Sequence, residues 1–86
     1  MSTNLEPVRQ PTSEDEIVSV LSHWLAFHLG NRELHARLLE IGTDELAPDS
    51  AEMVEELLDE LEHAPDGERG ELEMLVRETL ECVALG

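Results

Sequence analysis

The chain has very few positive charges for its 86 residues. Five arginines and no lysine stand against 21 acidic residues, so the formal net charge is -16 at pH 7. Phosphate recognition depends on cationic side chains and on counterion release, so this balance argues against direct binding to nucleic acid. An anionic membrane surface is disfavoured for the same reason. We therefore expect a partner that is itself basic.

Cysteine and long apolar runs are also scarce. The single Cys82 has no partner for an internal disulfide, which suits a reducing compartment. No stretch approaches the roughly 20 apolar residues that span a bilayer, and the N-terminus lacks the pattern of a signal peptide. We expect a cytosolic protein that does not associate with membranes.

The residues that are present favour helices. Leucine dominates the apolar residues, while β-branched residues are sparse and only two aromatic residues occur. A chain of this length forms one domain with a thin core. Apolar residues recur at helical spacing in four segments, at about 13–29, 32–41, 50–64 and 68–84. We predict an all-α fold, a small antiparallel bundle of four helices in which the second helix is short.

The start of the fold is marked by proline and by a capping motif. Residues 1–12 show no period and contain two prolines, so we predict a flexible, disordered N-terminal arm before a single domain at 13–86. Ser13 and Glu16 match the capping box that starts a helix.

The boundary between the first two helices has two interpretations. Gly30 is expected to take a left-handed C-cap conformation with Asn31 as the next N-cap, so that the chain turns. Alternatively, Gly30 only bends one long helix. The third helix is predicted to begin near Asp49 or Ser50, because Pro48 holds Ala47 outside helical geometry.

The first helix suggests self-association. Its apolar residues cover an arc of about 200°, which is wider than the stripe that one neighbour needs. Because the chain is also too short to build a deep core, we predict a homodimer.

The acidic residues are concentrated in the second half of the chain. Residues 44–86 hold fifteen acids and two arginines, whereas residues 1–43 hold six acids and three arginines. One side of the third helix is almost purely anionic, and Met74 projects away from the apolar stripe of the fourth helix. The predicted contacts with a partner are the acids and a possible apolar anchor: Glu52, Glu55, Glu56, Asp59, Glu60 and Met74.

These features predict a non-enzymatic interaction module that acts as a regulator, an inhibitor or an adaptor on a basic protein surface. One form of this hypothesis is a DNA mimic that occupies a DNA-binding protein, since rows of carboxylates resemble rows of phosphates. Arg32 and Arg37 lie near a helix-turn-helix pattern, but the net charge argues against DNA reading. No glycine-rich phosphate loop, nucleophile motif or Cys-His pair occurs, so no enzyme is expected.

Three residues are candidate metal ligands. His28, His35 and Cys82 all fall on the apolar sides of their predicted helices, and convergence in the core would offer three ligands for zinc. A structural zinc site normally has four ligands, and no paired Cys or His spacing is present. We therefore expect hydrogen-bonded histidines with no metal and no cofactor.

A second function is suggested by Asp49-Ser50 at a helix start, followed by Ala-Glu-Met-Val-Glu. This order resembles acyl and peptidyl carrier proteins, which are acidic helical bundles of similar size. The resemblance implies phosphopantetheine on Ser50 and an acidic helix that docks on basic enzymes. Ala51 and Pro48 depart from the bulky residue and the glycine-rich approach usual in that family. Asp49-Ser50 is also an ordinary helix cap.

Overall fold

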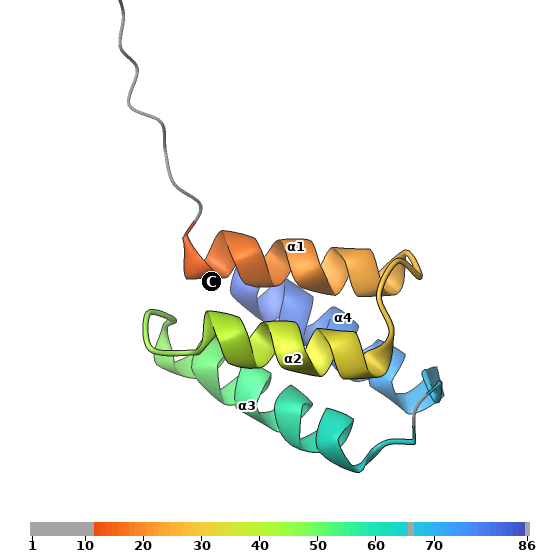
Figure 1. The fold of residues 1–86 in the computed structure, drawn as a ribbon. Helices are drawn as coiled ribbons and strands as arrows, with labels where there is room; N and C mark the ends of the chain where they lie inside the picture. Colours follow the sequence, from red (N-terminus) through yellow and green to blue (C-terminus); the bar gives the residue numbers. More distant parts are fainter. Residues whose placement is uncertain (1–11, 66, 86) are drawn as a thin grey trace, which may run out of the picture.

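The computed structural model describes residues 12–65 and 67–85 of the chain (Figure 1). This part contains four helices and no strand, which confirms the predicted all-α fold and the short second helix. The predicted arm over residues 1–12 lies outside the described residues, apart from Thr12. The helices are α1 (Ser13–Leu25), α2 (Asn31–Ile41), α3 (Pro48–His63) and α4 (Gly70–Leu85).

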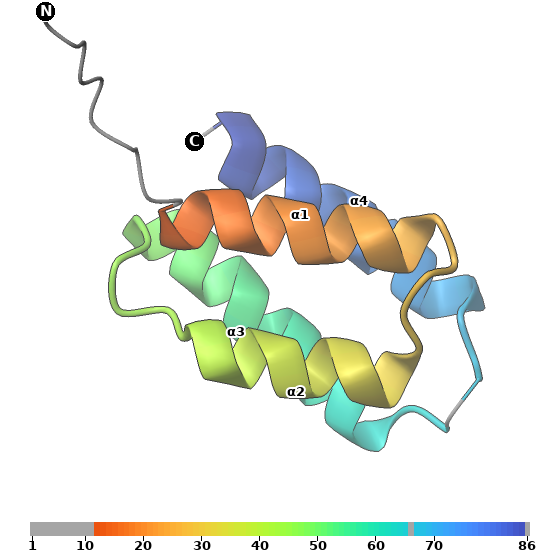
Figure 2. The same cartoon turned by 45° about the horizontal axis from the view of Figure 1, so that its top comes forward.

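The helices form an antiparallel bundle (Figures 1 and 2). Each helix packs against the next one along the chain, and α1 also packs against α4. Across the described residues, the backbones of the diagonal pairs α1–α3 and α2–α4 stay more than 8 Å apart between Cα atoms, so each helix occupies a corner. The wide apolar arc of α1 therefore faces two neighbours of the same chain. None of the four helices is long and apolar enough to cross a lipid bilayer.

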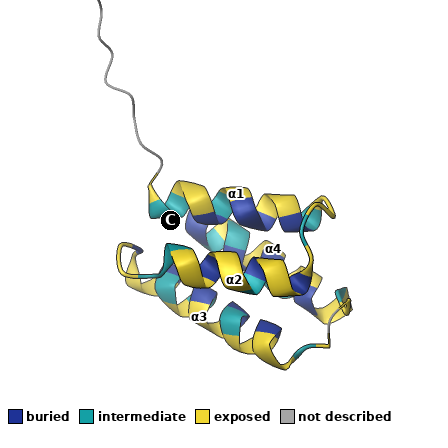
Figure 3. Cartoon of the chain, viewed as in Figure 1, coloured by how far each residue is buried: buried dark blue, intermediate teal, exposed yellow. Residues whose placement is uncertain are grey.

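The core lies along the axis of the bundle and uses side chains from all four helices, while the outward surfaces are exposed (Figure 3). Trp24 of α1 is its largest fully buried side chain. Leu46, in the connector between α2 and α3, covers one end. The remaining buried apolar residues are Ile17, Val20, Leu21, Leu34, Leu38, Val54, Leu57, Leu61, Leu72, Val76 and Val83.

The start of α1 differs by one residue from the prediction. The capping box is formed by Thr12 and Asp15: the Thr12 hydroxyl accepts from the Asp15 amide at 3.1 Å, and the Asp15 carboxylate accepts from the Thr12 amide at 3.3 Å. Asp15 reaches back to the cap as a glutamate would. The Ser13 hydroxyl instead donates to Glu45 at 3.0 Å, which links α1 to the α2–α3 connector.

The end of α1 also differs, since the helix stops at Leu25 and not at Leu29. The left-handed residue is Phe27, with φ 67°, whereas Gly30 has φ -89°. The Phe27 amide donates to Trp24 and the His28 amide donates to His23, which is the hydrogen-bond pattern of a Schellman motif. The sequence predicts the left-handed residue at Gly30, because glycine takes a positive φ readily and phenylalanine seldom does.

Asn31 is the first residue of α2 and not its cap, which is Gly30. The Asn31 side chain is buried and accepts from Trp24 Nε1 at 2.8 Å. Its amide group donates to the Glu68 carbonyl at 2.7 Å. One buried amide therefore ties α1 and α2 to the loop that precedes α4.

The third and fourth helices lie close to their predicted positions. Ala47 is extended, as expected before proline, and Pro48 occupies the first turn of α3, so neither Asp49 nor Ser50 caps the helix. The inner side of α4 includes Thr79, which the predicted apolar stripe omitted. Thr79 is fully buried, and its hydroxyl donates to the Leu75 carbonyl oxygen at 2.8 Å. This hydrogen bond offsets the cost of burying the hydroxyl.

Candidate functional site

The outward side of α3 is a continuous acidic surface. This helix carries seven acids and no arginine or lysine. The five acids predicted to contact a partner are all exposed: Glu52, Glu55, Glu56, Asp59 and Glu60. Val54, Leu57 and Leu61 hold the opposite side in the core, so packing fixes which way the carboxylates point. We call the surface made by these five acids the α3 acidic face.

The acids of this face have almost no cationic neighbours. Within residues 12–65 and 67–85, the ion pairs are Arg77–Glu73 at 3.0 Å and His63–Asp59 at 3.8 Å, and both are exposed. Such exposed pairs contribute little to stability. Four of the five acids therefore have no ion-pair partner in the described structure, and only Asp59 has a cationic neighbour, His63.

The acidic surface continues onto α4. Glu71, Glu78 and Glu81 are exposed there, and α4 packs beside α3. Met74 lies among these acids with 68 % of its surface exposed, as its helical position predicted. An apolar side chain thus stands within a field of carboxylates.

His63, at the end of α3, lies near three acids. Its Nδ1 is 2.8 Å from the Asp59 carbonyl oxygen and 3.8 Å from the Asp59 carboxylate. The backbone hydrogen bond, followed by the Asp59 charge, raises the pKa of His63 above 6.5, and Glu60 and Glu62 act in the same direction. The positive form also suits the C-terminus of a helix.

Asp59, Glu62 and His63 bring ligand atoms within 4.8 Å of one another. This group was not among the predicted metal ligands, although the i, i+3, i+4 spacing of the three residues indicates it. All three side chains are exposed, and nothing besides the grouping points to a bound ion.

The three proposed core ligands do not come together. In the part of the chain that is described, Asp59, Glu62 and His63 form the one cluster of possible metal ligands. His28 is exposed because α1 ends before it, which overturns its predicted place in the apolar arc. His35 and Cys82 are half-buried on α2 and α4, which are diagonal and not adjacent helices of the bundle.

Ser50, the attachment point implied by the carrier resemblance, is only 1 % exposed. Its Oγ lies 3.9 Å from the Cys82 sulfur, so the hydroxyl points between α3 and α4. Attachment of phosphopantetheine needs an accessible serine hydroxyl. The burial of Ser50 therefore weighs against this modification.

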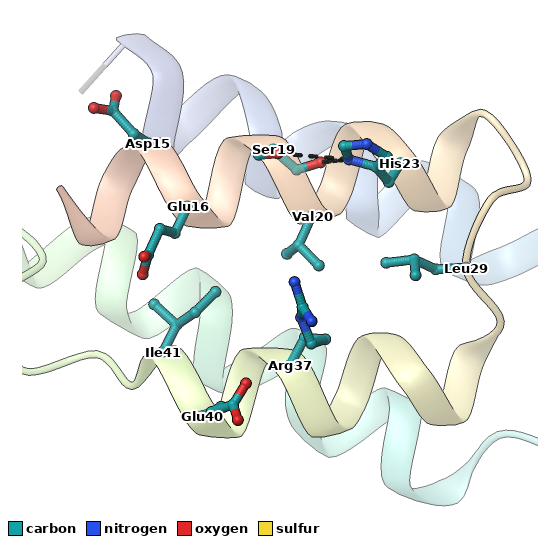
Figure 4. A pocket seen from close by; sticks show the side chains of 9 residues that line it. All are labelled: Asp15, Glu16, Ser19, Val20, His23, Leu29, Arg37, Glu40 and Ile41. Atoms are coloured by element: carbon teal, nitrogen blue, oxygen red, sulfur yellow. Dashed lines mark hydrogen bonds between the residues drawn. The ribbon is translucent and has the colours of Figure 1, made fainter. Parts of the chain in front are cut away.

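A groove of about 590 Å³ runs between α1 and α2 (Figure 4). Val20, Leu29 and Ile41 supply apolar side chains, and the Arg37 side chain extends from α2 towards Val20. The Ser19 carbonyl oxygen and His23 Nδ1 lie 2.7 Å apart on the α1 side. The groove carries charges of both signs, and the sequence patterns did not predict it.

Arg69 makes several contacts that the sequence patterns did not predict. Its guanidinium lies 3.8 Å from the centre of the Trp24 ring and 4.3 Å from that of Phe27. It also donates to the carbonyl oxygens of Trp24 and Leu29. These contacts make Arg69 a tie between the end of α1 and the start of α4, and no local sequence pattern reveals them.

Comparisons of the chain with protein-family models, with curated proteins and with solved structures find no match.

Proposed function

We propose that the chain is a non-enzymatic interaction module whose α3 acidic face binds a basic protein surface. The main observation in support of this proposal is that α3 presents seven acids and no arginine or lysine. Opposite charge on a partner would accelerate association and select against acidic proteins, while apolar contacts such as Met74 would supply lasting affinity. The module would act as a regulator, an inhibitor or an adaptor.

The exposed setting of the acids supports binding over catalysis. General acid-base chemistry needs a carboxyl group in a site that displaces its pKa, such as an apolar pocket. The acids of the α3 acidic face point into solvent from the side of a helix. The thiol of Cys82 is free, which fits the reducing conditions of the cytosol.

The average density of acids along the axis of α3 supports the DNA-mimic form of the proposal. A helix of 16 residues is about 24 Å long, so seven acids give about one carboxylate per 3.4 Å of axis. One strand of duplex DNA carries about one phosphate per 3.4 Å. In this form of the proposal, the partner is a DNA-binding protein and the module inhibits it.

Charge reversal at two positions tests the proposed face. Glu52→Lys with Asp59→Lys places two cations seven residues apart on α3, and we expect loss of a partner captured from native lysate at low salt. Glu33→Lys with Glu40→Lys on α2 is the matched control, because those acids are also exposed and seven residues apart. Both double variants change the net charge equally, so a difference between them reports the location of binding.

The identified partner then allows a kinetic test. We expect the α3 variant to bind it more slowly and with a flatter dependence on salt than the α2 variant. Release of the partner from duplex DNA by the wild-type protein would support the mimic. Equal association rates for both variants would contradict the α3 acidic face as the binding surface.

Homodimerisation also stays a proposal. The apolar arc of α1 faces α2 and α4 of the same chain. Within residues 12–65 and 67–85, the large apolar side chains left exposed are Phe27, Leu39, Met74 and Leu85. Light scattering across micromolar concentrations tests it, and a mass of one subunit throughout would rule out the dimer.

A further inference from the structure

The surface between α3 and α4 combines an apolar hollow with carboxylates. Met53 of α3 and Cys82 and Leu85 of α4 line a shallow hollow of about 550 Å³, together with Glu78 and Glu81. Leu85 is 87 % exposed. The apolar side chains here have no covering element in the described structure, and both acids are exposed.

A second hollow lies at the other end of the same pair of helices. It is lined by Glu60 and His63 of α3, by Glu68 of the connecting loop and by Glu71 of α4. The helices α3 and α4 run antiparallel (Figure 1). This hollow therefore lies by the end of α3 and the start of α4, whereas the Met53 hollow lies at the opposite ends. Met74 and Glu78 stand on α4 between these ends.

We infer that this α3–α4 surface is the docking site for a basic amphipathic helix of the partner. The inference rests on the proposed function and names the form of the partner. Lysines or arginines of the docked helix would meet Glu60, Glu71, Glu78 and Glu81, and its apolar stripe would cover Met53, Met74, Cys82 and Leu85. Methionine side chains adapt to varied apolar partners.

The dimensions fit such an occupant. Glu71 and Glu81 are ten residues apart on α4, about 15 Å along the axis. A partner helix of 14 residues is about 21 Å long and covers both hollows. Helices that lie in grooves place apolar anchors at spacings of three, four and seven residues and carry charges on their flanks. A cationic peptide without that period could satisfy the acids but could not fill the Met53 hollow.

The test uses a 14-residue peptide of sequence LKKLLKLLKKLLKL and a shuffled peptide of the same composition that lacks the helical period. We expect the full-length protein to bind the first peptide at least tenfold more tightly by fluorescence anisotropy at 0.1 M salt. We also expect circular dichroism to show a gain of helix on binding. Equal affinity for both peptides would support binding of cations by the acids but would overturn docking of an amphipathic helix on the α3–α4 surface.

Variants of exposed residues locate the contact without disturbing the core. We expect Met74→Gln and Leu85→Gln each to weaken binding of the periodic peptide about fivefold. Leu39→Gln on α2 is the matched control, because Leu39 is 59 % exposed on a helix that does not contact α4, and it should change affinity less than twofold. Equal loss in all three variants would overturn the proposed location.

Two further outcomes separate this inference from the proposed function. Binding of neither peptide, with lysate capture still sensitive to Glu52→Lys and Asp59→Lys, would overturn helix docking on the α3–α4 surface. It would leave the α3 acidic face supported as the binding surface. A dimeric wild-type protein that becomes monomeric with Met74→Gln and Leu85→Gln would show that a second copy of the chain covers the α3–α4 surface. That result would overturn the proposal that a partner helix docks there.

Discussion

The guanidinium of Arg69 covers the ring of Trp24 at 3.8 Å and donates to the Trp24 carbonyl oxygen. Trp24 is the largest fully buried side chain of the bundle, and Arg69 lies 45 positions further along the sequence. In a chain with five cations, this one is used to join the carboxyl end of α1 to the start of α4. The negative end of the α1 dipole favours a cation at this position.

Removal of Arg69 is expected to destabilise the bundle. Arg69→Ala loses the cation–π contact and two hydrogen bonds to backbone carbonyls, so we expect the free energy of unfolding to fall by about 2 kcal/mol. Arg69→Lys should recover only part of this, because lysine lacks the planar fork of donors. Urea unfolding followed by Trp24 fluorescence measures the change. Arg77→Ala, which breaks an exposed pair, is the control and should cost less than about 0.5 kcal/mol.

The Asn31 side chain is expected to contribute about as much to the free energy of unfolding as a core leucine side chain. Asn31→Ala leaves the Trp24 indole N–H and the Glu68 carbonyl without their partner, and the free energy of unfolding should fall by about 2–3 kcal/mol. The neighbouring Arg32→Ala, at an exposed position, serves as the control in the same urea experiment. Equal stability of the two variants would contradict a structural role for the buried amide.

Phe27 stores backbone strain at the end of α1. Its φ of 67° is a left-handed conformation that glycine adopts with little cost. We therefore expect Phe27→Gly to be more stable than Phe27→Ala by about 1 kcal/mol in chemical denaturation, since both lose the ring over Arg69. The order should reverse at Ala26, where φ is -86° and Ala26→Gly should destabilise.

The pH dependence of His63 follows from its raised pKa. A group whose pKa is raised on folding stabilises the folded state fully below the unfolded value of 6.5, and this contribution disappears as the pH rises through the folded value. NMR titration of the His63 ring should give a midpoint above 6.5. Asp59→Asn should lower the midpoint only in part, because the backbone hydrogen bond is the larger cause. A wild-type midpoint at or below 6.5 would disprove this account.

Modification of Ser50 tests the carrier resemblance directly. Because the hydroxyl is buried, we expect incubation with a phosphopantetheinyl transferase and coenzyme A to leave the mass of the protein unchanged. A known carrier protein in the same reaction controls for activity of the transferase. A mass gain that disappears in Ser50→Ala would restore the carrier function and displace the interaction module.

The number, type and rough limits of the helices followed from local pattern, because apolar spacing, Pro48 and the polar turns act over a few residues. The exposure of the acids on α3 followed as well. A helix with a single apolar side must bury that side, and the carboxylates then face solvent. The position of Met74 was predictable by the same geometry.

Features that depend on residues far apart in the sequence could not be predicted from local pattern. Hydrogen bonds from Arg69 hold the end of α1 at Leu25. Asn31 was predicted to cap α2, but its side chain is buried and bonds to the loop at Glu68. The grouping of Met53 with Cys82 and Leu85 likewise needs α3 and α4 in contact. Helical period records which side of a segment is apolar, but contacts between residues 29 to 45 positions apart arise only when the helices pack.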